Sequence, residues 1–138
     1  MATLAYHITD IRNIALAGHG ASAKTSLVDA LLFAAGATDR RGSVDDGTSL
    51  SDVDDEEKRR HITIDCHLLH LEWKGKQVHL IDSPGYPDFI GNALSALAAV
   101  ENVLVTVSAP TGIEVNTRRM FHEAGRLGLS AGAELTVT

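Results

Sequence analysis

Residues 18–25 combine the side chains and the spacing that could hold a polyphosphate. In a strand, loop and helix arrangement the backbone N–H groups of such a loop converge on one point, and the helix dipole adds positive potential. Lys24 would then reach the β- and γ-phosphates, and the hydroxyl of Thr25 would ligate Mg²⁺. The segment reads Gly18-His19-Gly20-Ala21-Ser22-Ala23-Lys24-Thr25, close to the pattern G-x-x-x-x-G-K-[ST].

One position of this loop departs from the pattern, because Ala23 replaces the second glycine. If that position needs a positive φ, the methyl group costs about 1 kcal/mol. Taken alone, the loop has a second interpretation, in which Ser22 caps a helix and Lys24 is solvated. The rest of the chain has to decide between the two.

A second cluster of polar residues, Asp82-Ser83-Pro84-Gly85, directly follows the apolar run 78–81. At the C-terminal end of a parallel strand, Asp82 would lie beside the phosphate loop and could hold Mg²⁺ through water. Gly85 would offer its backbone N–H to the terminal phosphate. Alone these residues would indicate an ordinary turn. Behind a phosphate loop they favour a binding site.

The elements that would position these residues alternate in the order of an α/β domain. Apolar residues at helical spacing predict helices from Lys24 to Gly36, from Phe89 to Ala98 and over 120–127, whereas continuous apolar runs predict strands at 13–17, 78–81 and 103–107. Alternation over 62–73, with a change of phase near Leu68, predicts a bulged strand that forms a hairpin with 78–81. Residues 37–61 are a long polar segment, and such segments are usually functional or mobile.

Composition limits the classes of function. With 138 residues, 44% of them hydrophobic, the chain has material for one compact core. The net charge of −6 argues against independent binding to nucleic acid or to anionic membranes. Cys66 is the only cysteine, which excludes an internal disulfide and suits a reducing compartment. Without a secretion-like start or an apolar stretch of about 20 residues, we expect a cytoplasmic protein.

Two other groupings have simpler explanations than a metal site. The histidines at 61, 67, 70 and 79 do not have the spacing of a zinc site, so we expect solvated or paired side chains. The acids between Asp52 and Glu57 lack the glycine and terminal glutamate of a calcium loop. We interpret them as a solvated segment.

Taken together, the motifs resemble the G domain of the translational GTPases, most closely elongation factor G and its paralogues. Arg60-His61-Ile62-Thr63-Ile64 resembles the family's R-G-I-T-I, with His61 in place of glycine. Residues 82–89 resemble D-T-P-G-H-x-D-F, residues 109–114 resemble the loop after the next strand, and 42–48 with Asp52 resemble the start of the first switch. Several motifs in the right order are far more specific than any one.

The resemblance implies a three-layer α/β P-loop G domain with a mostly parallel sheet and one antiparallel hairpin. Residues 1–138 would be its N-terminal portion, with the phosphate loop at 18–25, switch I at about 37–63 and switch II at about 82–92. GTP or GDP with Mg²⁺ would bind, and the ribosome would be the partner of the full-length protein. Thr63 would ligate the metal along with Thr25 and Asp82, and Thr63 and Gly85 would contact the γ-phosphate.

Two departures from the family pattern leave alternatives open. Tyr86 replaces the histidine that orients the attacking water, and a phenol cannot replace an imidazole, so we hypothesise impaired hydrolysis. The guanine-reading N-K-x-D is absent after Gly128, so the chain looks like the front part of a G domain, and we expect a missing strand and an exposed edge. The alternatives are a nonhydrolysing remnant that acts as an interaction module, or a P-loop ATPase.

Overall fold

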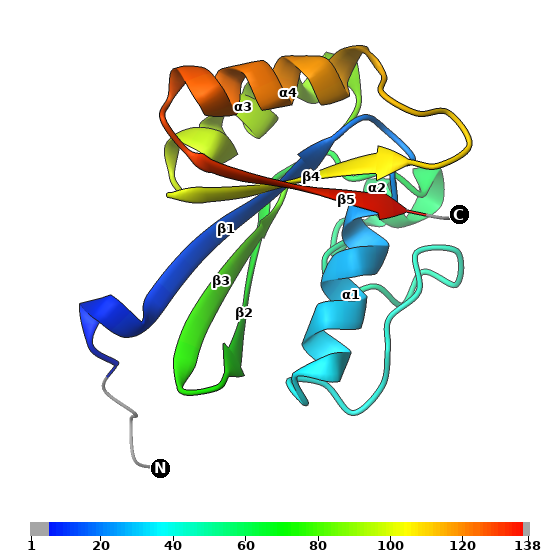
Figure 1. Ribbon diagram of the computed structural model, residues 1–138. Coiled ribbons are helices and arrows are strands. Elements are labelled where there is room, and N and C mark those ends of the chain that lie inside the picture. Colours follow the sequence, from blue (N-terminus) through cyan, green and yellow to red (C-terminus); the bar gives the residue numbers. More distant parts are fainter. Residues whose placement is uncertain (1–5, 137–138) are drawn as a thin grey trace.

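The computed structural model describes residues 6–136 and places the strands of that range in one twisted sheet between helices (Figure 1). The strands are β1 (Ile11–Gly18), β2 (His67–Trp73), β3 (Lys76–Asp82), β4 (Asn102–Ser108) and β5 (Ser130–Thr136). The α-helices are α1 (Lys24–Ala34), α2 (Asp55–Arg60), α3 (Ile90–Ala98) and α4 (Val115–Arg126), with short 3-10 helices η1 (Ile8–Asp10) and η2 (Pro87–Phe89).

Strand β1 lies at the centre of the sheet, whose order is β2-β3-β1-β4-β5. It pairs in parallel with β3 and β4, and β5 adds in parallel to β4. Only β2 is antiparallel, and it forms a hairpin with β3. The register pairs Leu16 of β1 with Asp82 of β3, so the C-terminal ends of these two strands lie side by side. The phosphate loop and the Asp82 cluster therefore both start at the C-terminal ends of neighbouring strands.

Two hydrophobic cores make the domain three-layered. Helix α1 buries Val28 and Leu32 against Leu16 and Leu80 on one face of the sheet. Helices α3 and α4 cover the other face, and Figure 1 shows them together on the side opposite α1. This arrangement confirms the predicted fold class, including the mostly parallel sheet and the single antiparallel hairpin.

Strand β2 differs from the predicted strand. It begins at His67 and not at Ile62, and it pairs with β3 residue for residue from His67 to Trp73, without a bulge at Leu68. The backbone N–H groups of Ile64 and Asp65 instead donate to the carboxylate of Glu57. The change of hydrophobic phase thus marks the passage from an irregular segment into the strand.

Helix α2 lies within the long polar segment, where the sequence analysis did not predict a helix. Asp54 caps its N-terminus, and a capping box joins Asp54 to Glu57. Acidic residues fill its first turn and Lys58, Arg59 and Arg60 its last, which suits the helix dipole. In the sequence, only the capping box and the order of charges indicate this helix. Six residues are too few to show the hydrophobic period of a helix.

The expectation that a strand is missing after Gly128 is wrong. Strand β5 pairs with β4 from Asn102 and Ser130 to Ser108 and Thr136. It forms an edge of the sheet, and its residues are almost all exposed. Its apolar residues Ala131, Ala133 and Leu135 alternate along the strand, but two of the three are alanine, so the signal is weak. Within the described residues, no helix is long and apolar enough to cross a membrane.

Candidate functional site

The loop between β1 and α1 contains left-handed residues, which occur in the backbone concavities that bind anions. Ala21 and Ala23 both adopt left-handed backbone angles, with φ of 58° and 59°. Ser22 does not cap α1, because its hydroxyl is 2.7 Å from the carbonyl oxygen of His19 and 2.6 Å from the hydroxyl of Thr106. The simpler interpretation of the loop, an N-cap with a solvated lysine, is therefore wrong.

Lys24 is the cation of this loop, and only 6% of its surface is exposed. Its Nζ donates to the carbonyl oxygen of His19 at 2.7 Å and to Ser22 Oγ at 3.4 Å. Burial lowers the pKa of Lys24 to about 8, although the nearby charge of Asp82 acts in the opposite direction. A buried ammonium group whose hydrogen-bond acceptors are neutral is suited to an anionic ligand.

Asp82 lies at the end of β3, where it is fully buried. Its Oδ2 accepts hydrogen bonds from Thr25 Oγ1 at 2.7 Å and Ser51 Oγ at 2.6 Å, whereas its Oδ1 has no hydrogen-bond partner. Burial raises the pKa of Asp82, and the two hydroxyl donors and Lys24 oppose this. An unpaired buried carboxylate oxygen is costly unless a ligand satisfies it.

Hydroxyl and carboxylate oxygens surround this carboxylate. Thr63 Oγ1 is 2.9 Å from Thr25 Oγ1, and it donates to Asp52 Oδ1 at 3.2 Å. Mg²⁺ prefers oxygen ligands of this kind. The predicted metal ligands Thr25, Thr63 and Asp82 thus meet at one point, and together with the unpaired Oδ1 they fit a magnesium ion.

Asp52 and Ser51 were not predicted as members of this cluster. The acids of residues 52–57 were interpreted as solvated, but Asp52 is 3% exposed and Glu57 is fully buried. Burial, followed by the neighbouring charge of Asp82, raises the pKa of Asp52. No local pattern distinguishes Asp52 from its exposed neighbours, because the groups that it meets, Thr63 and Asp82, are distant in sequence.

The turn at Gly85 approaches the phosphate loop closely. A Cβ atom on Gly85 would lie 2.7 Å from the carbonyl group of His19 and would also collide with Lys24 Nζ, so only glycine fits. The ring of Tyr86 lies over Gly20, where a Cβ would come within 2.9 Å of the ring atoms. From α4, Asn116 Nδ2 donates to the carbonyl oxygen of Gly85 at 2.8 Å and fixes the turn.

A cleft of about 270 Å³ opens between the loop and residues 44–63. The predicted site residues that line it are Gly20, Ala21, Ala23, Lys24, Thr25, Thr63, Gly85 and Tyr86. Gly18, His19, Ser22 and Asp82 lie outside this lining. The lining also includes residues that were not predicted as site residues, among them Ser26, Val44, Asp45 and Ile62.

The paired histidines of the hairpin lie outside this cleft. His67 Nε2 is 2.8 Å from Glu57 Oε1, and His79 Nδ1 is 2.9 Å from Asn13 Oδ1. Only His61 reaches the lining, with its Nδ1 2.9 Å from the carbonyl oxygen of Val44. His61 has a φ of 54°, a left-handed conformation that favours glycine, the residue of the family pattern at this position.

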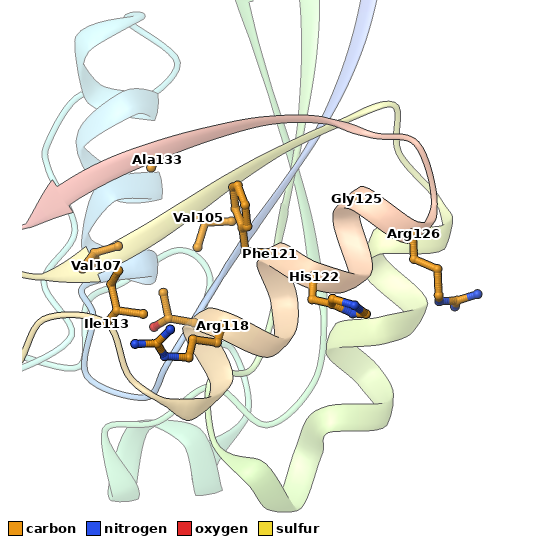
Figure 2. A pocket seen from close by; sticks show the side chains of 10 residues that line it. Val105, Val107, Ile113, Arg118, Phe121, His122, Gly125, Arg126 and Ala133 are labelled. Atoms are coloured by element: carbon orange, nitrogen blue, oxygen red, sulfur yellow. The ribbon is translucent and has the colours of Figure 1, made fainter.

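A larger groove lies elsewhere, between α4 and the strands β4 and β5 (Figure 2). It measures about 830 Å³, and Val105, Val107, Ile113 and Phe121 give it an apolar lining. The smaller cleft is the candidate functional site, since Lys24, Thr25 and Thr63 line it. The two hydroxyls are hydrogen-bonded to the carboxylates of Asp82 and Asp52.

The fold and this cluster define a class of protein. A central strand leads through a glycine-containing loop into a helix, and an aspartate ends the neighbouring parallel strand, which is the arrangement of a P-loop nucleotide-binding domain. Residues 9–133 match the family of the elongation factor Tu GTP binding domain, and the chain belongs to that family. The predicted resemblance to the translational GTPases is thus confirmed.

Several relatives share this domain. The chain is 33% identical over 126 residues to an elongation factor G-like protein of Mycobacterium tuberculosis, covering 91% of this chain and 18% of the relative. It is 34% identical over 119 residues to the tetracycline resistance protein TetM from transposon Tn1545 of Enterococcus faecalis, covering 86% of this chain and 19% of the relative. The chain therefore spans less than a fifth of the length of these relatives.

Two solved structures are similar to this chain in fold. A crystal structure of a protein from Thermus thermophilus superposes with a TM-score of 0.87 at 42% identity, covering 91% of this chain and 19% of the other. A bacterial selenocysteine-specific elongation factor superposes with a TM-score of 0.74 at 25% identity, covering 90% of this chain and 19% of the other.

Proposed function

We propose that this chain binds GTP and GDP with Mg²⁺, and that it hydrolyses GTP as part of an elongation factor G-like translation factor whose partner is the ribosome. The observation that carries the proposal is the convergence of Lys24, Thr25, Thr63 and Asp82 beside one cleft. Family membership favours a guanine nucleotide. The boundaries of switch I at about 37–63 and switch II at about 82–92 belong to the same proposal.

Each residue has a distinct part in binding. Lys24 and the backbone N–H groups of residues 20–25 neutralise the β- and γ-phosphates. Thr25, Thr63 and Asp82 hold the metal directly or through water, and Mg²⁺ supplies positive charge at the phosphate oxygens. Gly85 presents its N–H to the terminal phosphate. Since Gly85 also packs on His19, movement of the turn and of the loop would be linked.

Hydrolysis requires in-line attack of water on the γ-phosphate. Tyr86 lines the cleft and its hydroxyl can orient water by a hydrogen bond, but it cannot take up a proton as an imidazole does. We therefore propose slow turnover for this chain. The two alternatives, a nonhydrolysing interaction module and an ATPase, are outcomes of the tests. Tyr86 bears on the first of them, but neither is supported over GTP binding and hydrolysis by a member of this family.

Binding of a fluorescent GDP tests the proposal. Lys24→Ala should weaken binding at least about 100-fold, because the buried cation is lost from the phosphate site. The matched control is Lys74→Ala, an exposed lysine in the hairpin turn, which should leave the affinity unchanged. An unaltered dissociation constant for Lys24→Ala would refute the assignment. Stronger competition by ATP than by GTP would instead establish the ATPase alternative.

A further inference from the structure

The backbone of Ile64, the residue after Thr63, is held from two sides by side chains. Its N–H donates to Glu57 Oε1 at 2.9 Å, and its carbonyl oxygen accepts from Asn92 Nδ2 at 3.1 Å. Glu57 belongs to α2 and Asn92 to α3. We name Glu57 and Asn92, with the Ile64 backbone between them, the Ile64 clamp. Strand pairing does not hold Ile64, since β2 begins only at His67.

Glu57 is the more deeply buried side of the clamp, and its side chain is 1% exposed. Its Oε1 also accepts from the N–H of Asp65 at 3.2 Å, and its Oε2 accepts from the N–H of Asp54 at 3.3 Å. His67 Nε2 lies 2.8 Å and 2.9 Å from the two oxygens. A buried carboxylate is tolerated only with such a set of partners, so α2 is tied to the residues before β2.

Asn92 completes the clamp from the opposite side. Its Nδ2 donates to Asp65 Oδ1 at 3.0 Å as well as to the Ile64 carbonyl, and its own carbonyl oxygen accepts from Cys66 Sγ at 3.1 Å. Helix α3 begins at Ile90, and only the short helix η2 separates it from the turn that carries Gly85 and Tyr86. A shift of this turn that moved α3 would therefore move a support of Ile64.

We propose that Glu57 and Asn92 are positioning residues that set the place of the Thr63 hydroxyl. Both act through the Ile64 backbone, and neither lines the cleft. The clamp holds Thr63 Oγ1 within 2.9 Å of Thr25 Oγ1 and beside Asp52. Because its supports come from α2 and α3, the placement of Thr63 depends on both proposed switch regions. This role at the metal rests on the proposed function.

Amide hydrogen exchange of the nucleotide-free chain tests the clamp itself. Glu57→Gln preserves the size of the side chain, but its NH2 group must face backbone N–H donors whichever way the amide turns, those of Ile64 and Asp65 or that of Asp54. Exchange at Ile64 and Asp65 should become about tenfold faster. The matched control, Glu56→Gln, changes the next residue of the same helix, whose ion pairs with Arg59 and Arg60 are exposed, and should leave both amides unchanged.

Asn92→Ala tests the other side of the clamp. It leaves α2 unaltered, so it remains informative if Glu57→Gln disturbs the folding of α2. Exchange over residues 62–67 should rise about threefold or more, because the Ile64 carbonyl loses its support. Ser95→Ala on α3, which removes only a bond to Gly91 within the helix, is the control. Unchanged exchange in both Glu57→Gln and Asn92→Ala would overturn the clamp.

Nucleotide affinity separates positioning from mere structural support. Thr63 would contact the γ-phosphate, so Glu57→Gln should lose about tenfold in affinity for a nonhydrolysable GTP analogue while GDP affinity stays within about twofold. Equal losses for both nucleotides, or faster exchange without a change in their ratio, would overturn the positioning role. If the parent chain binds neither nucleotide, the proposed function fails, and with it the metal-related role. The exchange experiment then still decides whether the clamp exists.

Discussion

If the chain hydrolyses GTP as proposed, we expect the rate of hydrolysis to depend most directly on Tyr86. Its ring fills the space above Gly20, where any Cβ would collide with it, so the tyrosine and the glycine fit one another. The side chain is 36% exposed and faces the cleft. This packing holds a phenol where a water-orienting group is expected, and explains how the loop accommodates a ring larger than imidazole.

Replacing Tyr86 should therefore change the chemical step. We expect Tyr86→His to raise the single-turnover rate of GTP hydrolysis at least about tenfold, because a positioned imidazole can accept a proton from water. Tyr86→Phe should lower the residual rate if the phenol hydroxyl orients water. GDP affinity serves as the control and should not change in either variant. Equal rates for the parent and Tyr86→His would refute the hypothesis of impaired hydrolysis.

We expect Lys24 to link nucleotide binding to pH. Burial lowers its pKa to about 8 in the free protein, whereas the unfolded chain keeps the ordinary value of 10.5. Between these values the unfolded state binds the proton that the folded state has lost, so Lys24 makes stability rise with pH across this window. Phosphate binding should restore the proton, because the anion favours the ammonium form.

Calorimetric titrations with GDP in two buffers of different ionisation enthalpy measure this proton. At about pH 8.5 we expect net uptake that approaches one proton per nucleotide, and at about pH 6.5 we expect none from Lys24. Lys24→Arg should abolish the uptake, since arginine remains charged throughout this range. Uptake that persists in Lys24→Arg would show that another group binds the proton.

The junction between the phosphate loop and α1 carries backbone strain. Ala23 stands at the N-cap with φ of 59° and ψ of 28°, and it makes no side-chain hydrogen bond there. A left-handed alanine costs about 1 kcal/mol relative to a glycine. We therefore expect the alanine at this position to lower the stability of the loop.

Ala23→Gly should raise the free energy of unfolding by about 1 kcal/mol in urea denaturation, because glycine adopts the left-handed conformation without strain. The matched control is Ala30→Gly, the same replacement inside α1, which should lower stability by about the same amount. Opposite signs for the two variants are the decisive result. A loss of stability in Ala23→Gly would contradict the assignment of strain to the loop.

Most helices and strands could be predicted from sequence because their own residues show the hydrophobic pattern of that element. Strands β1, β3 and β4 are apolar runs, and α1 and α3 have apolar faces, so local pattern suffices for them. Helix α2 and strand β5 were harder to predict, because α2 shows only a capping box and its charge order, whereas β5 has mostly alanine as its apolar residues and depends on pairing with β4. The candidate site could be predicted for the same reason, since Lys24 and Asp82 each lie in a short motif that is visible in the sequence.

At the scale of the whole molecule, apolar surface gathers beside the edge strand β5. Phe121 is 56% exposed and Ile113 is 59% exposed, and Figure 2 shows both beside the groove between α4 and β4. Arg118 and Arg126 also line the groove, in a chain whose net charge is −6. The phosphate cleft shares none of these residues. Changes in the groove should therefore leave nucleotide binding intact.

A dye that fluoresces on apolar surfaces, such as anilinonaphthalene sulfonate, measures this separation in the 138-residue chain. Phe121→Ser should reduce dye fluorescence by about half or more, because the largest apolar side chain of the groove is lost and its arginines alone do not hold the aromatic dye. Leu68→Ser is the matched control, since Leu68 is 69% exposed on β2 but lies outside this groove, and it should change the signal little. An equal decrease in both variants would show that the dye reports scattered exposed side chains. A change in GDP affinity on Phe121→Ser would show instead that the groove and the cleft are coupled.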